Sequence, residues 1–249
     1  MSNTDAEIST ALLAARRGGA PISVAAQASH TVSHADAYKV QSNIAAETGA
    51  IGAWKVGRGA PGAEPFWAPI FERDVMADGT NLARPSNDEV GIEVEIAFRL
   101  NDRIGQPGAD NSDPRDFIAS AHVVIETVES RLAAPLEAVE TWKISDNLLN
   151  GGLVVGPEIP NWRDINLESQ HVQLEVDGTT KVDQKGSNPG GDPFKLLSWT
   201  LAQGKTHCGG LKTGQLLTTG SLSGLQFYPA GSQLTANYPD LGLSVSVGI

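Results

Sequence analysis

Val90-Gly91-Ile92-Glu93-Val94-Glu95-Ile96-Ala97-Phe98 is the most regular stretch of this sequence. Its even-numbered positions are all apolar, while Glu93 and Glu95 fall on the odd-numbered ones. Because side chains alternate across a strand, the pattern predicts a strand with both glutamates on one face. Their Cα atoms would lie about 6.6–7 Å apart, so both carboxylates could reach one central point.

Two carboxylates that share a point repel each other, and a shared proton or a divalent cation relieves the repulsion. Ligation by oxygen alone favours Mg²⁺ or Mn²⁺ over zinc. The alternative is the solvated face of an ordinary amphipathic strand, and on spacing alone this alternative is the commoner one. Glu126 adds a third carboxylate, because it lies inside the aliphatic strand expected over 122–128 and needs a partner there. The alternative is that Glu126 pairs with Arg131 or is partly exposed.

Lys55 lies between Trp54 and Val56 in another expected strand. A lysine is rarely buried without a counter-ion or a function. Near a metal it could hold the carboxylate of an anionic substrate, and with a lowered pKa it could transfer protons. The alternative is a surface lysine whose aliphatic stem covers apolar neighbours.

Several other polar residues are candidates for the same site. Asp146 and Asn150 lie in a turn-rich stretch that is equally typical of a simple Asx turn. Glu72 and Asp74 are possible acid/base groups or surface charges. Ser221 follows a short strand, where hydroxyl and backbone N–H groups could receive a carboxylate. The five histidines show no metal-ligand spacing.

The rest of the chain divides into two compositional halves. The first 50 residues have helical periodicity, with helices expected to begin near residue 4 and at Ser33, whereas the chain from about residue 85 consists of strands and turns. The sequence therefore predicts an α+β fold, with a helical N-terminal region over 1–82 and a β-rich metal-binding domain over 83–249.

Composition excludes some partners. The 249 residues carry 29 acidic against 18 basic side chains, a net charge of −11, which disfavours nucleic acid and anionic membranes. Cys208 is the single cysteine, so no internal disulfide forms. With no signal-peptide pattern and no apolar run of about 20 residues, we expect a cytoplasmic protein without a membrane span.

Taken in order, the motifs resemble the fumarylacetoacetate hydrolase superfamily and, within it, the 2-keto-4-pentenoate hydratase / 4-oxalocrotonate decarboxylase branch. The resemblance covers about residues 5–248. It is carried by Ala37-Tyr38-Lys39-Val40-Gln41, Trp54-Lys55-Val56-Gly57, Gly91 to Phe98, Glu126-Thr127-Val128-Glu129-Ser130-Arg131, Asp146-Asn147, Asn150-Gly151-Gly152 and Thr218 to Gly224.

This resemblance implies a small helical N-terminal region followed by a mixed β-roll that holds a divalent metal, Mg²⁺ or Mn²⁺. It places the metal ligands at Glu93, Glu95 and Glu126. It gives Lys55 a catalytic or carboxylate-binding role. The acidic residue of the loop after that lysine corresponds to Glu72 or its neighbour Asp74.

The resemblance also implies that Asp146, Asn150 and Ser221 contact the substrate. One departure concerns the residues after Asp-Asn, where hydratases of the branch have Ala-Ser and this chain has Leu148-Leu149. A polar contact is thereby lost, and Asn150 is its candidate replacement.

The activity implied is a lyase that adds water to a 2-hydroxy-2,4-dienoate, a product of aromatic ring cleavage. The alternatives are a 2-oxo acid decarboxylase or a C–C bond hydrolase on the same scaffold, and a non-catalytic binding subunit. The resemblance further implies a homo-oligomer, with a related decarboxylase as a possible partner.

Overall fold

The computed structural model describes residues 3–58, 62–82, 89–105, 113–166, 169–188, 191–203 and 206–249. The helices are α1 Asn3–Arg16, α2 Val24–Ala28, α3 His34–Thr48, α4 Glu140–Ser145 and α5 Pro193–Gln203. The strands are β1 Ile51–Arg58, β2 Pro65–Phe71, β3 Val75–Ala77, β4 Thr80–Asn81, β5 Glu89–Leu100, β6 Ile118–Val128, β7 Asn150–Glu158, β8 Ser169–Val176, β9 Thr179–Ser187, β10 Leu216–Thr218, β11 Gln226–Pro229, β12 Gln233–Tyr238 and β13 Leu243–Gly248. Short 3₁₀ turns include Glu72–Asp74, Pro114–Phe117, Asn147–Leu149 and His207–Gly209.

The strands form two sheets. The larger sheet has the order β2-β1-β10-β5-β6-β7-β3, with β11 also paired to β5, and the smaller sheet has the order β4-β13-β12-β8-β9. Apolar side chains of both sheets and of α5 form the main core, which includes Phe98, Ile125 and Tyr238. The α+β class and the mixed sheets are therefore confirmed.

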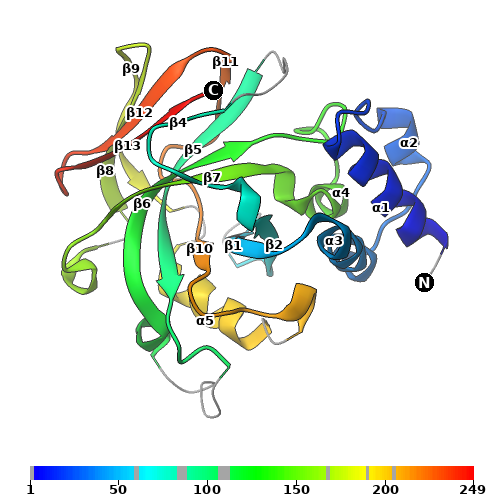
Figure 1. Ribbon diagram of the computed structural model, residues 1–249, viewed down its shortest axis with the longest axis horizontal. Coiled ribbons are helices and arrows are strands. Elements are labelled where there is room, and N and C mark those ends of the chain that lie inside the picture. The colour runs from blue at the N-terminus through cyan, green and yellow to red at the C-terminus, as the bar shows by residue number, and fades with distance from the viewer. Residues whose placement is uncertain are drawn as a thin grey trace.

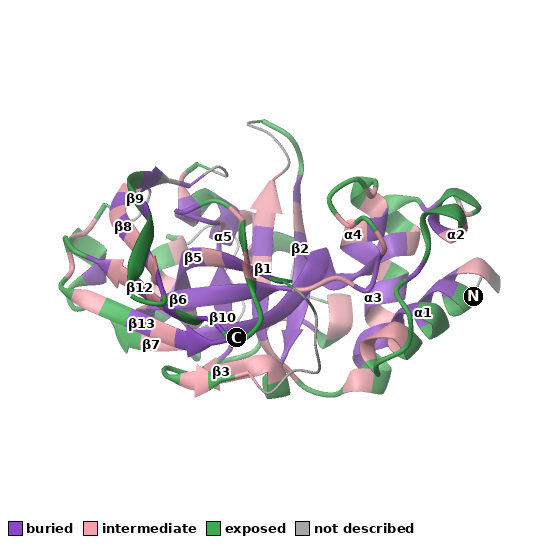
Figure 2. Ribbon diagram, turned by 90° about the horizontal axis from the view of Figure 1, so that it is seen from above, coloured by how far each residue is buried: buried purple, intermediate pink, exposed green. Residues whose placement is uncertain are grey.

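The helical region gathers at one end of the molecule, where α1, α2 and α3 lie beside α4 (Figure 1). Ser33 caps α3, because its side chain accepts a hydrogen bond from the backbone N–H of Asp36 at 3.2 Å. The inner faces of these helices are buried and their outer faces are exposed (Figure 2). They build a second core with Phe71 and Trp142.

Strands from both halves of the sequence share the sheets. β1 pairs in parallel with β10, and β4 pairs in parallel with β13. β1 and β4 are thus joined by hydrogen bonds to strands of the C-terminal half. The division at residue 82 stays a prediction, and the strands on its two sides are interleaved.

His207 joins the 3₁₀ turn after α5 to helix α3, since its Nε2 lies 2.8 Å from Oε1 of Gln41. Burial lowers the pKa of His207 from its usual 6.5 to about 4. The unfolded chain therefore takes up this proton at a higher pH than the folded protein does, and stability falls as the pH drops from about 6.5 to about 4.

We expect His207→Gln to remove this part of the pH dependence. Urea unfolding of wild type and variant between pH 7 and pH 4 measures it. As the pH falls, wild type should lose more unfolding free energy than the variant does. A difference between the two proteins that stays constant with pH would contradict the assignment.

Candidate functional site

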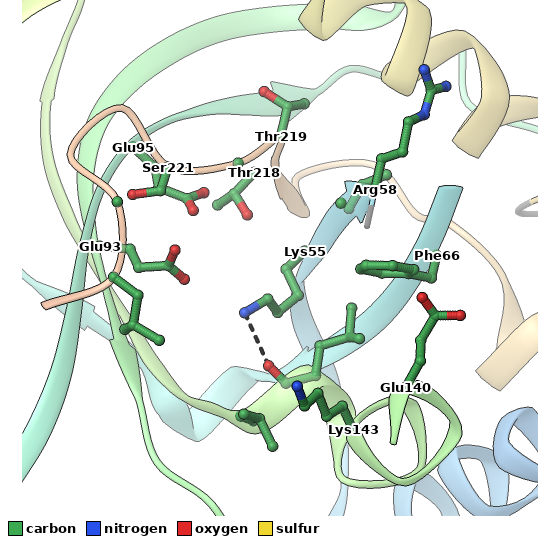
Figure 3. Close-up of a pocket in the computed structure, with 17 residues that line it drawn as sticks. Lys55, Arg58, Phe66, Glu93, Glu95, Glu140, Lys143, Thr218, Thr219 and Ser221 are labelled. Atoms are coloured by element: carbon green, nitrogen blue, oxygen red, sulfur yellow. Dashed lines mark hydrogen bonds between the residues drawn. The ribbon is translucent and has the colours of Figure 1, made fainter. Parts of the chain in front are cut away.

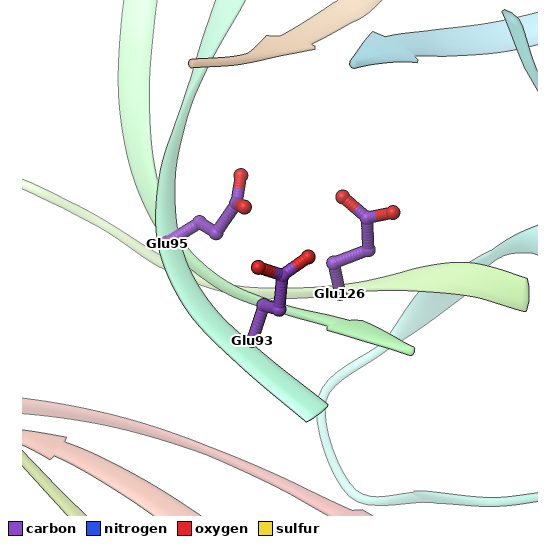
Figure 4. Close-up of side chains that lie close together, drawn as sticks. All are labelled: Glu93, Glu95 and Glu126. Atoms are coloured by element: carbon purple, nitrogen blue, oxygen red, sulfur yellow. The ribbon is translucent and has the colours of Figure 1, made fainter. Parts of the chain in front are cut away.

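Three glutamates from two neighbouring strands converge. β5 carries Glu93 and Glu95, β6 carries Glu126, and the antiparallel register places Glu93 directly opposite Glu126. Such cross-strand partners have Cβ atoms about 4.5–5.5 Å apart on the same face. One carboxylate oxygen of each residue lies within 4.8 Å of the others, and the three side chains point toward one another (Figure 4).

The glutamates are deeply placed. Glu126 is fully buried and Glu95 is 2% exposed. Burial raises the pKa of Glu95 well above its usual value, with the charges of Glu126 and Glu93 adding to the effect. Burial likewise raises the pKa of Glu93, and Glu126 adds to it while Lys55 opposes it. This cluster of negative charge favours a bound cation.

The donor set fits a hard divalent cation. Oε2 of Glu95 and Oε2 of Glu126 are buried and have no hydrogen-bond partner among the described residues. Buried oxygens of this kind normally have a partner, and a cation would supply one. Because all candidate ligands are carboxylate oxygens, the set suits Mg²⁺, Mn²⁺ or Ca²⁺.

Lys55 on β1 approaches the same cluster. Its Nζ forms an ion pair and hydrogen bond with Oε1 of Glu126 and donates to the carbonyl of Leu148 at 3.1 Å. Asn150 Nδ2 donates to the same Glu126 oxygen at 3.0 Å. Burial disfavours the ammonium form, but the glutamates together outweigh it, so the pKa of Lys55 is raised. The side chain is therefore a cation at neutral pH.

These groups open into a cavity of about 490 Å³. Figure 3 shows Lys55 between the carboxylates of Glu93 and Glu95 on one side and Phe66, Glu140 and Lys143 on the other. The lining consists of Lys55, Val56, Gly57, Arg58, Phe66, Glu93, Glu95, Glu140, Lys143, Leu148, Leu149, Thr218, Thr219, Gly220, Ser221, Gly224 and Leu225. Charged groups thus lie around an otherwise largely apolar interior.

A left-handed turn forms one wall of the cavity. Asn147, Leu148 and Leu149 have φ angles of 51°, 53° and 61°. Such angles are uncommon outside glycine, and each costs of order 1–3 kcal/mol where the residue is not glycine. The turn directs the Leu148 carbonyl at Lys55 and places both leucine side chains against the cavity. The strained backbone of this turn therefore helps to position the Lys55 ammonium group.

The structure separates the sequence-predicted candidates into two groups. Ser221 lines the cavity, and Asn150 reaches it through Glu126. Asp146 is turned away, because both of its carboxylate oxygens accept hydrogen bonds from Arg131. Glu72 lies exposed in the 3₁₀ turn after β2, and Asp74 lies partly buried at the end of the same turn. Neither is part of the cavity lining.

Four charged or aromatic lining residues were not predicted from the sequence: Arg58, Phe66, Glu140 and Lys143. They come from the ends of β1 and β2 and from α4, elements that only the tertiary fold brings to the carboxylates. No motif marked Phe66, Glu140 or Lys143. Arg58 lies three residues after Lys55, and this second cation near the first was the one signal that could have found it.

Comparison with known proteins identifies the family of the chain. The family model described as fumarylacetoacetate (FAA) hydrolase, C-terminal, matches residues 24–246. The chain belongs to this family. Among its curated relatives is a 2-keto-4-pentenoate hydratase of Burkholderia vietnamiensis, which is 25% identical over 181 residues, 72% of this chain and 68% of the relative.

Solved structures of other enzymes have a similar fold. The 4-oxalocrotonate decarboxylase of Pseudomonas putida G7, complexed with magnesium and adipate, superposes with a TM-score of 0.81 at 19% identity and covers 100% of this chain and 98% of its own. The fumarylpyruvate hydrolase of Pseudomonas aeruginosa, in complex with Mn²⁺ and pyruvate, has a TM-score of 0.55 at 20% identity and covers 79% and 89%. These likenesses confirm the β-roll architecture.

Within the described part of the chain, no helix is long and apolar enough to cross a membrane.

Proposed function

We propose that the chain is a divalent-metal-dependent lyase that adds water to a 2-hydroxy-2,4-dienoate and yields a 4-hydroxy-2-oxo acid. The observation that carries the proposal is the convergence of Glu93, Glu95 and Glu126 opposite the ammonium of Lys55 inside one cavity. The similarity to a 2-keto-4-pentenoate hydratase supports this activity over others of the family.

The three glutamates would hold Mg²⁺ or Mn²⁺. When bound, such a cation supplies Lewis acidity to the keto and carboxylate oxygens of a 2-oxo acid. Solved relatives with magnesium and with Mn²⁺ support this choice of metal. Asn150 would act through Glu126, because its amide donates to the carboxylate oxygen that also contacts Lys55.

The other side chains would bind and orient the substrate. Lys55, as a buried cation, would hold the substrate carboxylate, and the hydroxyl of Ser221 would contact its polar end. Leu149 and Leu225 would pack against the apolar diene and orient it for the addition of water. These apolar walls favour a substrate whose far end is uncharged.

Proton transfer is assigned to a bound water rather than to Glu72, since Glu72 lies outside the cavity lining. Asp146 would act indirectly. Its pairing with Arg131 fixes the start of the turn that carries Leu148 and Leu149.

Lys55→Met tests the role of the lysine. We expect kcat/KM to fall about 10- to 100-fold, because a charge-assisted hydrogen bond is worth about 1.5–3 kcal/mol. Mn²⁺ affinity should be retained or increased, since the variant removes a cation that competes for Glu126. Loss of Mn²⁺ binding together with activity would instead indicate that Lys55 only holds the glutamate in place.

The assay that tests the reaction follows the ultraviolet absorbance of a 2-hydroxypenta-2,4-dienoate, with mass spectrometry of the product. A product heavier by one water supports hydration. Loss of carbon dioxide from an oxalocrotonate would favour a decarboxylase, and two fragments from an acylpyruvate would favour a C–C bond hydrolase. Tight binding without turnover of any of the three would favour a binding subunit. A homo-oligomer, with a related decarboxylase as partner, stays a prediction.

A further inference from the structure

A second cavity, of about 560 Å³, lies next to the first. It is formed by α3, α4, α5 and the segment that enters β2, so elements from distant parts of the sequence enclose it. Its lining consists of His34, Tyr38, Ala63, Glu64, Pro65, Phe66, Trp67, Glu140, Trp199, Gln203 and His207. Phe66 and Glu140 belong to both cavities and form the wall between them.

Aromatic rings set at steep angles line this second cavity. The rings of Trp67 and Trp199 are 86° apart in plane, and those of Tyr38 and His207 are 78° apart. The Trp67 and His207 ring centroids lie 5.2 Å apart. The rings therefore present their faces in different directions, as the aromatic side chains around a bound cation do.

Acidic groups carry the charge of the described lining. Among the described lining residues, Glu64 and Glu140 are the only carboxylates, and none is a lysine or an arginine. The pKa of Tyr38 is raised, first by burial and then by the charges of Glu140 and Glu64. Burial keeps His207 uncharged at neutral pH by lowering its pKa to about 4.

The walls are held in place by hydrogen bonds. Trp199 Nε1 donates to Oε1 of Glu64 at 2.8 Å, which joins a ring to a carboxylate. Nε2 of His34 lies 2.8 Å from Oε1 of Glu140. Because these hydrogen bonds already fix the side chains, the rings lose little freedom when a ligand binds.

We propose that this second cavity binds an organic cation of the quaternary-ammonium type. The ring faces attract a desolvated cation, and the two carboxylates add Coulombic attraction. An anion would be repelled by Glu64 and Glu140, and a neutral hydrocarbon would gain nothing from them. The proposal is independent of the lyase activity, because it uses neither the metal ligands nor Lys55.

Choline is the probe for this site. Titration of choline, followed by saturation-transfer NMR of its N-methyl protons, is expected to give binding at least about tenfold tighter than that of 3,3-dimethylbutan-1-ol, its neutral isostere. Equal binding of the two compounds would overturn the proposal, because it would show an apolar cavity without cation selectivity. Preferential binding of 3,3-dimethylbutyrate would overturn it as well.

Two variants locate the binding. Trp199→Leu removes a ring face and Glu64→Gln removes one charge, and each is expected to weaken choline binding about three- to tenfold. Glu175→Gln, on β8 of the other sheet, is the matched charge control and should leave binding unchanged. Mn²⁺ binding at the glutamate cluster should persist in all three. If Trp199→Leu does not fold, Glu64→Gln decides, and wild-type affinity in Glu64→Gln overturns the proposal.

Discussion

Replacing Glu95 with glutamine is expected to abolish Mn²⁺ binding and to lower kcat/KM by about 10³-fold, which corresponds to roughly 4 kcal/mol of lost metal-dependent stabilisation. Glutamine has nearly the same shape, but it lacks the negative charge that holds a divalent cation. Isothermal titration with Mn²⁺ and turnover of a 2-hydroxydienoate measure the two effects separately.

The same substitution should stabilise the metal-free protein. Because the pKa of Glu95 is raised in the folded state, the unfolded chain releases this proton first, and folding loses stability as the pH rises above about 4.5. Glutamine carries no charge and so removes this loss of folding stability. We therefore expect a higher urea midpoint for the metal-free variant at pH 7, and no further stabilisation when Mn²⁺ is added.

Glu158→Gln is the matched control, because Glu158 lies exposed at the end of β7 in the same sheet. It should change neither Mn²⁺ affinity nor stability. Full activity of Glu95→Gln, or of wild type in excess EDTA, would exclude the metal-dependent mechanism.

Breaking the Arg131–Asp146 pair is expected to cost the fold about 3–5 kcal/mol. Both side chains are buried, with exposed fractions of 8% and 1%. Asp146→Ala would leave a guanidinium in the interior without its counter-ion. Arg131 also donates to the carbonyls of Asn150 at 2.8 Å and Asp146 at 2.7 Å, so the turn that faces Lys55 should loosen.

Chemical denaturation measures the stability loss, and kcat/KM under folding conditions reports the displaced turn. Asp116→Ala is the control, since its pair with Arg103 at 3.3 Å is roughly half exposed and should contribute less than about 1 kcal/mol. Similar costs for the two variants would contradict the structural role given to Asp146.

Patterns within short stretches of sequence predicted the elements whose conformation depends on neighbouring residues. The alternation through Val90–Phe98 predicted β5, because one apolar and one polar face require a period of two. Ser33 predicted the start of α3, where its side chain caps the helix. The convergence of the three glutamates followed from strand geometry together with the family resemblance.

Contacts distant in sequence determined the rest. Helix α2 has five residues and too little periodicity to be recognised. The left-handed turn at Asn147–Leu149 is locally disfavoured, and Arg131 holds it from another element. A contact distant in sequence also decides the role of Asp146. The motif around it suggested a substrate contact, but its carboxylate pairs with Arg131.

The direct pairing of Glu93 with Glu126 makes the site a reporter of strand alignment. Sliding β5 by one residue along β6 would keep most backbone hydrogen bonds but turn two of the three carboxylates to the opposite side of the sheet. A cation would then find no chelating set. Single-residue insertions in either strand should therefore reduce metal binding more than many point substitutions do. Metal affinity can also be used to select molecules with correctly aligned strands from libraries of variants.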